Sequence, residues 1–268
     1  MTDKLTLDEI AQRAGVSRTT ASRVLNNRPN VRPEVRERVQ QVIEETGYSP
    51  NPVARSLAIQ HTHILGLVLP RRSDTVFTDP YFPVLIQGIA QACNDHEYTL
   101  GLFLLQTPEE ERKLLPRIAH KGLLDGLIIQ VGEIGDQLIA RLLEKNVPLV
   151  VAGRPAQEIP VSYIDVDNVT GAYQAVSHLI RLGHTRIGTI TGALNTTAAL
   201  DRRTGYEQAL REHGLPLEDA LVAPGNFNES SGYQAMQQLL PHRPTAIFVA
   251  SDVMVFGALR ALSEAGLR

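Results

Sequence analysis

The sequence predicts a small all-α helix-turn-helix headpiece, followed by an α/β body with two doubly wound parallel-sheet subdomains. Short helical patterns separated by a turn at Gly15 occupy the first part of the chain. From Ile64 onward, runs rich in Val, Ile and Leu alternate with helical patterns, as in parallel sheets covered on both faces. Two such series follow one another, divided near residues 153–160, which predicts two subdomains with a cleft between them.

Length and composition favour an ordinary cytosolic protein. The chain has 268 residues, enough for about two domains with a sizeable core. No apolar run follows Lys4, so we expect no secretory signal, and no apolar stretch has the length of about 18 residues that would span a membrane. The single cysteine, Cys93, excludes an internal disulfide framework and a multi-cysteine metal site.

Positive charge is concentrated near the N-terminus. The net charge of the chain is −3, but residues 1–60 carry nine Lys and Arg against seven Asp and Glu. Seven arginines and only two glutamates lie between Arg13 and Arg38. A basic patch on an acidic body is typical of a protein that touches phosphate with one end, although a chance cluster on a solvated face is the alternative.

Start and stop signals predict three short helices in the headpiece. Thr6 and Glu9 have the spacing of a capping box, and the helix that they begin is expected to bury Ile10 and its apolar neighbours. Ser17 is placed to cap a second helix that runs to about Asn26. A third helix is expected from Pro33 to Gly47. This arrangement is that of a helix-turn-helix, whose second helix enters the major groove.

The second predicted helix has one apolar and one polar face. Ala21, Val24 and Leu25 share one side, and no carboxylate lies between Ala14 and Val31. On the other side, Arg18 and Arg23 are expected to reach base edges, and Thr19 to contact a base. Ser22 and Asn26 are expected to contact phosphates.

The stretch "LTLDEIAQRAGVSRTTASRVLNN" resembles the DNA-binding headpiece of the lactose-repressor family, the LacI/GalR-type bacterial regulators. One departure is Arg32, where Ser is a common helix cap in that family. The resemblance implies a transcription regulator that binds a near-palindromic operator as a homodimer. The predicted DNA contacts of the headpiece are Thr6, Ser17, Arg18, Thr19, Ser22, Arg23, Asn26 and Asn30.

The segment "YSPNPVARSLA" has two interpretations. A helix that starts at Asn51 would hold only about seven residues, too few to persist alone in water, so an ordinary linker is one reading. The resemblance implies the other, a hinge helix that folds on DNA and inserts Leu57 into the minor groove. Its predicted contacts are Asn51, Val53, Ala54, Arg55 and Leu57.

The body also resembles the family, whose ligand-binding part has the type I periplasmic-binding fold. The sequence "LIRLGHTRIG" is typical of that part. The strands predicted for the first series are 64–70, 99–105, 126–131 and 148–153, with helices at 82–94, 109–120 and 137–145. The strands predicted for the second series are 162–166, 186–192, 221–223 and 246–251, with helices at 170–182, 201–213, 230–240 and 253–266.

The resemblance implies a small-molecule effector, a sugar by preference and a nucleobase as runner-up, bound beyond the carboxyl ends of the strands. Its predicted contacts are Tyr81, Phe82, Gln130, Arg202, Phe227 and Asp252. Gln130 is the weaker candidate, and the other five have structural alternatives: Tyr81 and Phe82 as plain core, Arg202 in a surface ion pair, Phe227 as a cover for the sheet, and Asp252 as a helix cap. Asp167 and Asn168 are interpreted as caps first and ligands second.

The predicted organisation is a headpiece at 1–48, a hinge at 49–61 and an effector-binding and dimerisation domain at 62–268. Within the last, we place the N-subdomain at about 62–155 and the C-subdomain at about 156–268. Family chains usually continue further, so the resemblance implies that the C-subdomain is incomplete.

Two other classes of protein are alternatives to a regulator. A solute-binding protein without a DNA role is opposed by the headpiece and by the missing signal. An enzyme is opposed by the lack of a G-x-S-x-G elbow, a P-loop, an H-E-x-x-H pair or a Cys/His cluster. We therefore expect no catalytic residues, no metal and no cofactor. The leading prediction is a cytoplasmic transcription regulator, most often a repressor in this family, whose operator affinity depends on the effector.

Overall fold

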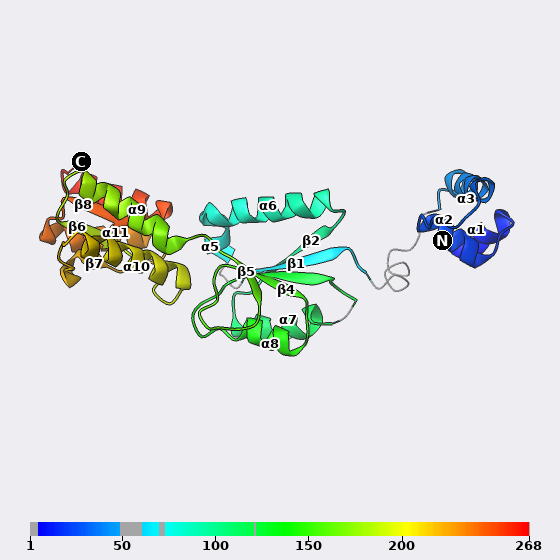
Figure 1. Cartoon of the computed structure of the whole chain (residues 1–268), viewed down its shortest axis with the longest axis horizontal. Helices are drawn as coiled ribbons and strands as arrows, with labels where there is room; N and C mark the ends of the chain where they lie inside the picture. The colour runs from blue at the N-terminus through cyan, green and yellow to red at the C-terminus, as the bar shows by residue number, and fades with distance from the viewer. Residues whose placement is uncertain (1–4, 49–60, 70–72, 121, 268) are drawn as a thin grey trace. The chain divides into compact units, whose positions relative to one another are not determined.

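The computed structural model describes residues 5–48, 61–69, 73–120 and 122–267. The chain divides into two compact units, Met1–Thr62 and His63–Arg268. They are shown together in Figure 1 and are described one at a time below. The predicted hinge contacts Asn51, Val53, Ala54, Arg55 and Leu57 lie outside the described residues.

The first unit is a three-helix cluster with α1 (Leu7–Arg13), α2 (Arg18–Leu25) and α3 (Pro33–Thr46). The capping box between Thr6 and Glu9 begins α1, as predicted, and the Ser17 hydroxyl accepts a hydrogen bond from the amide of Thr20 to begin α2. Arg32 gives α3 no side-chain cap, and left-handed Gly47 ends it. The core of the cluster is formed by Ile10, Ala11, Ala14, Ala21, Val24 and Val39.

The second unit begins with a five-stranded parallel sheet in the order β2-β1-β3-β4-β5. Its strands are β1 (Ile64–Leu69), β2 (Thr99–Leu104), β3 (Gly126–Gln130), β4 (Leu149–Ala152) and β5 (Ser162–Ile164). Its helices are α5 (Ser73–Thr78), α6 (Tyr81–Asp95), α7 (Pro108–Ile118) and α8 (Leu138–Glu144). Figure 1 shows α6 on one face of this sheet and α7 and α8 on the other.

Successive side chains of β1 point to opposite faces of the sheet. Leu67 and Leu69 pack with Phe82 of α6, whereas Val68 between them packs with Leu138 and Leu142 of α8. Both sides of the strand are therefore buried, which explains its continuous apolar sequence.

One strand assignment was wrong. We predicted that residues 162–166 open the second series, but β5 pairs with β4 through Val150–Ser162, Val151–Tyr163 and Ala152–Ile164. It therefore closes one edge of the first sheet, and the change of sheet falls between Ile164 and Ile187. The short helix α5 was also not predicted.

The remainder of the second unit forms a three-stranded parallel sheet in the order β7-β6-β8. Its strands are β6 (Ile187–Ile190), β7 (Val222–Ala223) and β8 (Ala246–Val249). Its helices are α9 (Asn168–Arg181), α10 (Thr197–Glu212), α11 (Glu229–Leu239) and α12 (Asp252–Glu264), with 3₁₀ turns at Asp219–Leu221 and Leu240–His242.

Two glycines allow α11 and α12 to pack backbone against backbone. A Cβ atom on Gly257 would lie 1.9 Å from the carbonyl oxygen of Glu229, and one on Gly232 would lie 2.1 Å from that of Met254. No side chain fits at either position unless the helices separate. We call this contact the glycine seam.

Candidate functional site

The exposed face of α2 carries positive charge and hydroxyl groups. Arg18, Thr19 and Arg23 are exposed, while Ala21 and Val24 on the opposite face are buried in the core of the first unit. The helix therefore has one face fixed by packing and another left available for a ligand. The side chains on the available face match the donors and acceptors of base edges and phosphates.

Three of the predicted DNA-contacting side chains also have local structural roles. The Ser17 hydroxyl caps α2, and Asn26 Nδ2 donates to the carbonyl oxygen of Ser22 at 2.9 Å. The Thr6 hydroxyl donates to Glu9 Oε2 at 2.9 Å within the capping box. Asn30 is exposed.

A carboxylate that the sequence reasoning did not single out lies beside this face. Arg18 Nε is 3.6 Å from Asp8 Oδ1, and both side chains are largely exposed. Exposed pairs of this kind contribute little to stability and are easily exchanged for another partner. Arg18 can therefore leave Asp8 and contact DNA at little cost in free energy.

Arg202 of α10 lies at the carboxyl end of β8, where sequence reasoning expected a ligand contact. Its Nε donates to Asn168 Oδ1 at 2.9 Å, and Nη1 donates to the carbonyl oxygen of Ala250 at 2.6 Å. Its Cζ lies 5.9 Å from the centre of the Phe227 ring. The guanidinium is thus fixed by uncharged oxygens and an aromatic ring, so it does not form the surface ion pair that was the alternative.

Carboxylates surround this group at longer range. Burial lowers the pKa of the Arg202 guanidinium, and the negative charge of Asp165 opposes that shift, followed by smaller effects from Tyr81, Asp79 and Asp252. The arginine and these acidic groups therefore influence one another electrostatically. The site therefore combines one fixed guanidinium with the influence of three carboxylates.

Tyr81 and Gln130 come together as a pair. The Tyr81 hydroxyl donates to Gln130 Oε1 at 3.1 Å, and the ring remains half exposed while Gln130 is buried. Burial raises the pKa of Tyr81, and the hydrogen bond to Gln130 opposes that shift. Phe82, in contrast, is buried in the core with Leu67 and Leu69, so the structure supports its alternative as plain core.

Phe227 has an uncommon backbone. Its φ of 54° is left-handed, and its ring covers Gly192 so closely that a Cβ there would be 2.1 Å from Phe227 Cζ. The ring also packs against the core cluster that contains Met254. Asp252 is exposed at the start of α12, where Ser251 is the N-cap residue.

Two polar residues of this region were missed or undervalued. Asp165 follows β5, and its carboxylate accepts hydrogen bonds from the amides of Arg154 and Val166. Asn168, interpreted mainly as a cap, is buried and bonds Arg202, whereas Asp167 does cap α9 by accepting from the amide of Thr170. Because β5 was assigned to the wrong sheet, Asp165 at its carboxyl end was not recognised as part of this site.

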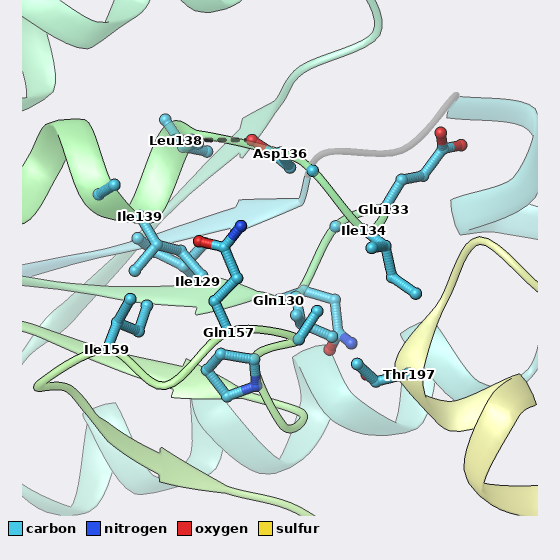
Figure 2. Close-up of a pocket in the computed structure, with 16 residues that line it drawn as sticks. Ile129, Gln130, Glu133, Ile134, Asp136, Leu138, Ile139, Gln157, Ile159 and Thr197 are labelled. Carbon is cyan, nitrogen blue, oxygen red and sulfur yellow. Dashed lines mark hydrogen bonds between the residues drawn. The ribbon is translucent and has the colours of Figure 1, made fainter.

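A pocket borders this polar group (Figure 2). It lies between the loop after β3 and the segment 155–159, and Gln130 and Thr197 belong to its lining. The Gln157 side chain extends across the pocket in Figure 2, while Glu133 is directed away from it. Asp136 Oδ1 accepts a hydrogen bond from the amide of Leu138, which fixes the start of α8 at its edge.

Comparison with known proteins decides the family. Residues 6–51 match the family described as bacterial regulatory proteins, lacI family. Residues 62–268 match the periplasmic binding proteins and sugar binding domain of LacI family. The chain belongs to the LacI family. It is a helix-turn-helix transcription regulator with a ligand-binding domain, so the predicted family, fold class and regulatory function are confirmed.

Individual members of the LacI family resemble this chain over nearly its full length. The HTH-type transcriptional regulator CelR of Thermobifida fusca is 37% identical over 267 residues, which is 98% of this chain and 78% of CelR. A CelR–cellobiose complex superposes with a TM-score of 0.74 at 35% identity, covering 98% of this chain and 79% of that one. A lac repressor dimer bound to operator and the anti-inducer ONPF gives 0.81 at 27% identity, covering 99% and 79%.

Within the described part of this LacI-family regulator, no helix is both long and apolar enough to cross a membrane. In the same residues, no group of three or more His, Cys, Asp or Glu side chains is arranged to hold a metal ion.

Proposed function

We propose that this LacI-family regulator is a repressor that binds a near-palindromic operator as a homodimer and responds to a sugar. The observation that carries the effector proposal is the group around Arg202, which combines one fixed guanidinium with several carboxylates. Sugar hydroxyl groups donate and accept at once, so they can bond both a guanidinium and carboxylates.

Aromatic surfaces support the same class of ligand. Tyr81 presents a half-exposed ring whose hydroxyl is held by Gln130, and Phe227 lies beside Arg202. Sugar rings and planar bases both pack on aromatic faces, so a nucleobase is the second candidate. The CelR–cellobiose complex among the similar structures favours the sugar. The proposed effector contacts are Tyr81, Gln130, Arg202, Phe227 and Asp252, joined by Asp165.

For DNA, we propose that Arg18, Thr19 and Arg23 read bases and that Ser22, Asn26 and Asn30 contact the backbone. Exposure of the first three supports this division. Thr6 and Ser17 would present their helix ends to phosphate. The proposed hinge contacts, including Leu57, rest on the family resemblance.

The homodimer is supported by the lac repressor dimer among the similar structures and by exposed apolar side chains on α12. Phe256 and Leu259 are both more than half exposed there, and a second copy would bury them. We further propose that the protein acts by binding alone, without catalysis, and in the cytoplasm, where operator DNA is found. Its similarity to transcription regulators supports both points.

The first experiment is selection of a random duplex pool with the full chain at fixed salt. A near-palindromic motif is expected, and cellobiose and other neutral sugars are then titrated against the complex. Binding without any motif would contradict sequence-specific regulation, since only charge attraction would remain. A motif whose affinity responds to a nucleobase and to no sugar would replace the proposed effector by the second candidate.

A further inference from the structure

Arg154 occupies a junction between the two sheets of the body. It follows β4 of the first sheet directly after Gly153, whose φ is 96°. Its amide donates to Asp165 Oδ2 at 3.1 Å, which ties it to the end of β5. Its carbonyl oxygen accepts a hydrogen bond from the Thr197 hydroxyl at 2.8 Å, at the start of α10.

The guanidinium of Arg154 completes the junction. Nη2 lies 2.6 Å from Asp201 Oδ1, and Nε lies 3.2 Å from Oδ2, so the contact is bidentate. The Asp201 side chain is 16% exposed and that of Arg154 is 41% exposed. Hydrogen bonding to Asp201 raises the pKa of Arg154, consistent with a fixed ion pair.

Asp201 immediately precedes Arg202 on α10. A second contact lies nearby, because the amide of Ile134 in the loop after β3 donates to the carbonyl oxygen of Asn195 at 2.7 Å. Loops at the carboxyl ends of β3 and β4 are thus bonded to the start of the helix that carries the proposed effector arginine. A rotation of one sheet against the other would therefore change the distances in these contacts.

We propose that the Arg154–Asp201 pair is a latch that positions α10 against the first sheet and thereby sets operator affinity in the absence of effector. The inference rests on the proposed function only in its link to DNA. A ligand shifts a two-state protein by its difference in affinity for the two states, and an internal contact acts in the same way. Half-buried bidentate pairs have the strength and the geometric selectivity for that role.

The test uses the full chain and four variants: Arg154→Gln, Asp201→Asn, the double variant, and the charge exchange Arg154→Asp with Asp201→Arg. Arg203→Gln is the matched control, since Arg203 forms a comparable ion pair with Glu207 on the same helix. Affinity for the selected operator duplex is measured without effector. Hydrogen exchange of the amides near Arg154 and in the first turns of α10 is measured without DNA.

Each single variant should shift operator affinity about fivefold in the same direction. The double variant should add little, because both changes remove one contact. Faster exchange at the junction should accompany these shifts, and the charge exchange should restore part of both. Arg203→Gln should leave both unchanged.

Unchanged exchange and affinity in the single variants, or fully additive effects in the double variant, would overturn the latch. If no operator is found, the proposed function fails, and the exchange measurement alone decides the latch. If a single variant does not fold, the charge exchange answers the same question, because it keeps an ion pair at the junction.

Discussion

Arg18 presents a guanidinium on the exposed face of α2, beside a carboxylate that it can release. We expect Arg18→Ala to weaken binding to the selected operator by about 1–3 kcal/mol and to relax specificity at one base pair of each half-site. Affinities for a set of single-base operator variants measure both effects. Arg38→Ala, a change of exposed charge on α3, is the control for charge alone. Equal losses for every sequence with Arg18→Ala would assign Arg18 to the phosphate backbone instead.

Arg202 is the fixed guanidinium at the centre of the proposed effector site. We expect Arg202→Ala to abolish the change in operator affinity on adding the sugar and to leave ligand-free operator binding within about threefold, because Arg202 is not one of the proposed DNA contacts. Titration of sugar against the protein–DNA complex is the measurement. A normal sugar response in this variant would show that the effector site lies elsewhere.

Individual side chains mark how far the sequence could predict the site. Gln130 ends β3, where ligand contacts are expected, whereas Tyr81 and Arg202 lie on helices and were predicted from the family resemblance. Asp165 was missed because the strand before it was assigned to the second series, although that strand pairs with β4 of the first sheet. Phe82 packs in the core, and its role could not be read from the sequence because a residue at a helix start can face either the cleft or the core.

At the scale of elements, local signals in the headpiece were strong enough to place all three helices. Caps, a turn glycine and an N-terminal proline act within a few residues, so they can be recognised without knowledge of the fold. The assignment of β5 to a sheet depends on long-range pairing, which no local pattern contains.

The capping box of α1 makes the headpiece sensitive to acid. Hydrogen bonds from the Thr6 amide and hydroxyl lower the pKa of Glu9 below the ordinary value of 4.5. A depressed folded-state pKa stabilises the fold above the unfolded-state pKa, and this contribution is lost as pH falls through the folded value. We expect NMR titration to give Glu9 a pKa below its ordinary value, and Thr6→Ala to raise it. An unchanged Glu9 pKa in Thr6→Ala would contradict the capping box.

The glycine seam predicts opposite effects for two chemically identical changes. Gly257→Ala should lower the free energy of unfolding by about 1–3 kcal/mol, because its methyl group would collide with the Glu229 carbonyl. Gly171→Ala, in α9 with no atom within 4 Å of the added Cβ, should raise it by about 0.5–1 kcal/mol. Thermal unfolding of both variants is the measurement. Equal shifts would mean that α11 and α12 separate easily.

For the whole molecule, the uneven charge distribution separates the two kinds of binding. The basic N-terminal part and the acidic body predict that operator affinity falls steeply as salt is added. The logarithm of the binding constant should fall with the logarithm of the salt concentration, with a slope of about −0.9 for each phosphate contacted. Affinity for an uncharged sugar should change little over the same range. Titrations at several salt concentrations check both. A shallow slope for DNA would mean that few arginines of the headpiece reach phosphate.

The glycine seam also has a consequence for building new regulators by recombination. A chimera that takes α11 from one parent and α12 from another brings together two surfaces that tolerate no Cβ at their crossing. A parent with alanine at either position would force the helices apart in such a hybrid, whatever its ligand. Crossover points for exchanging ligand preference between relatives therefore belong outside residues 229–264, so that both helices come from the same parent.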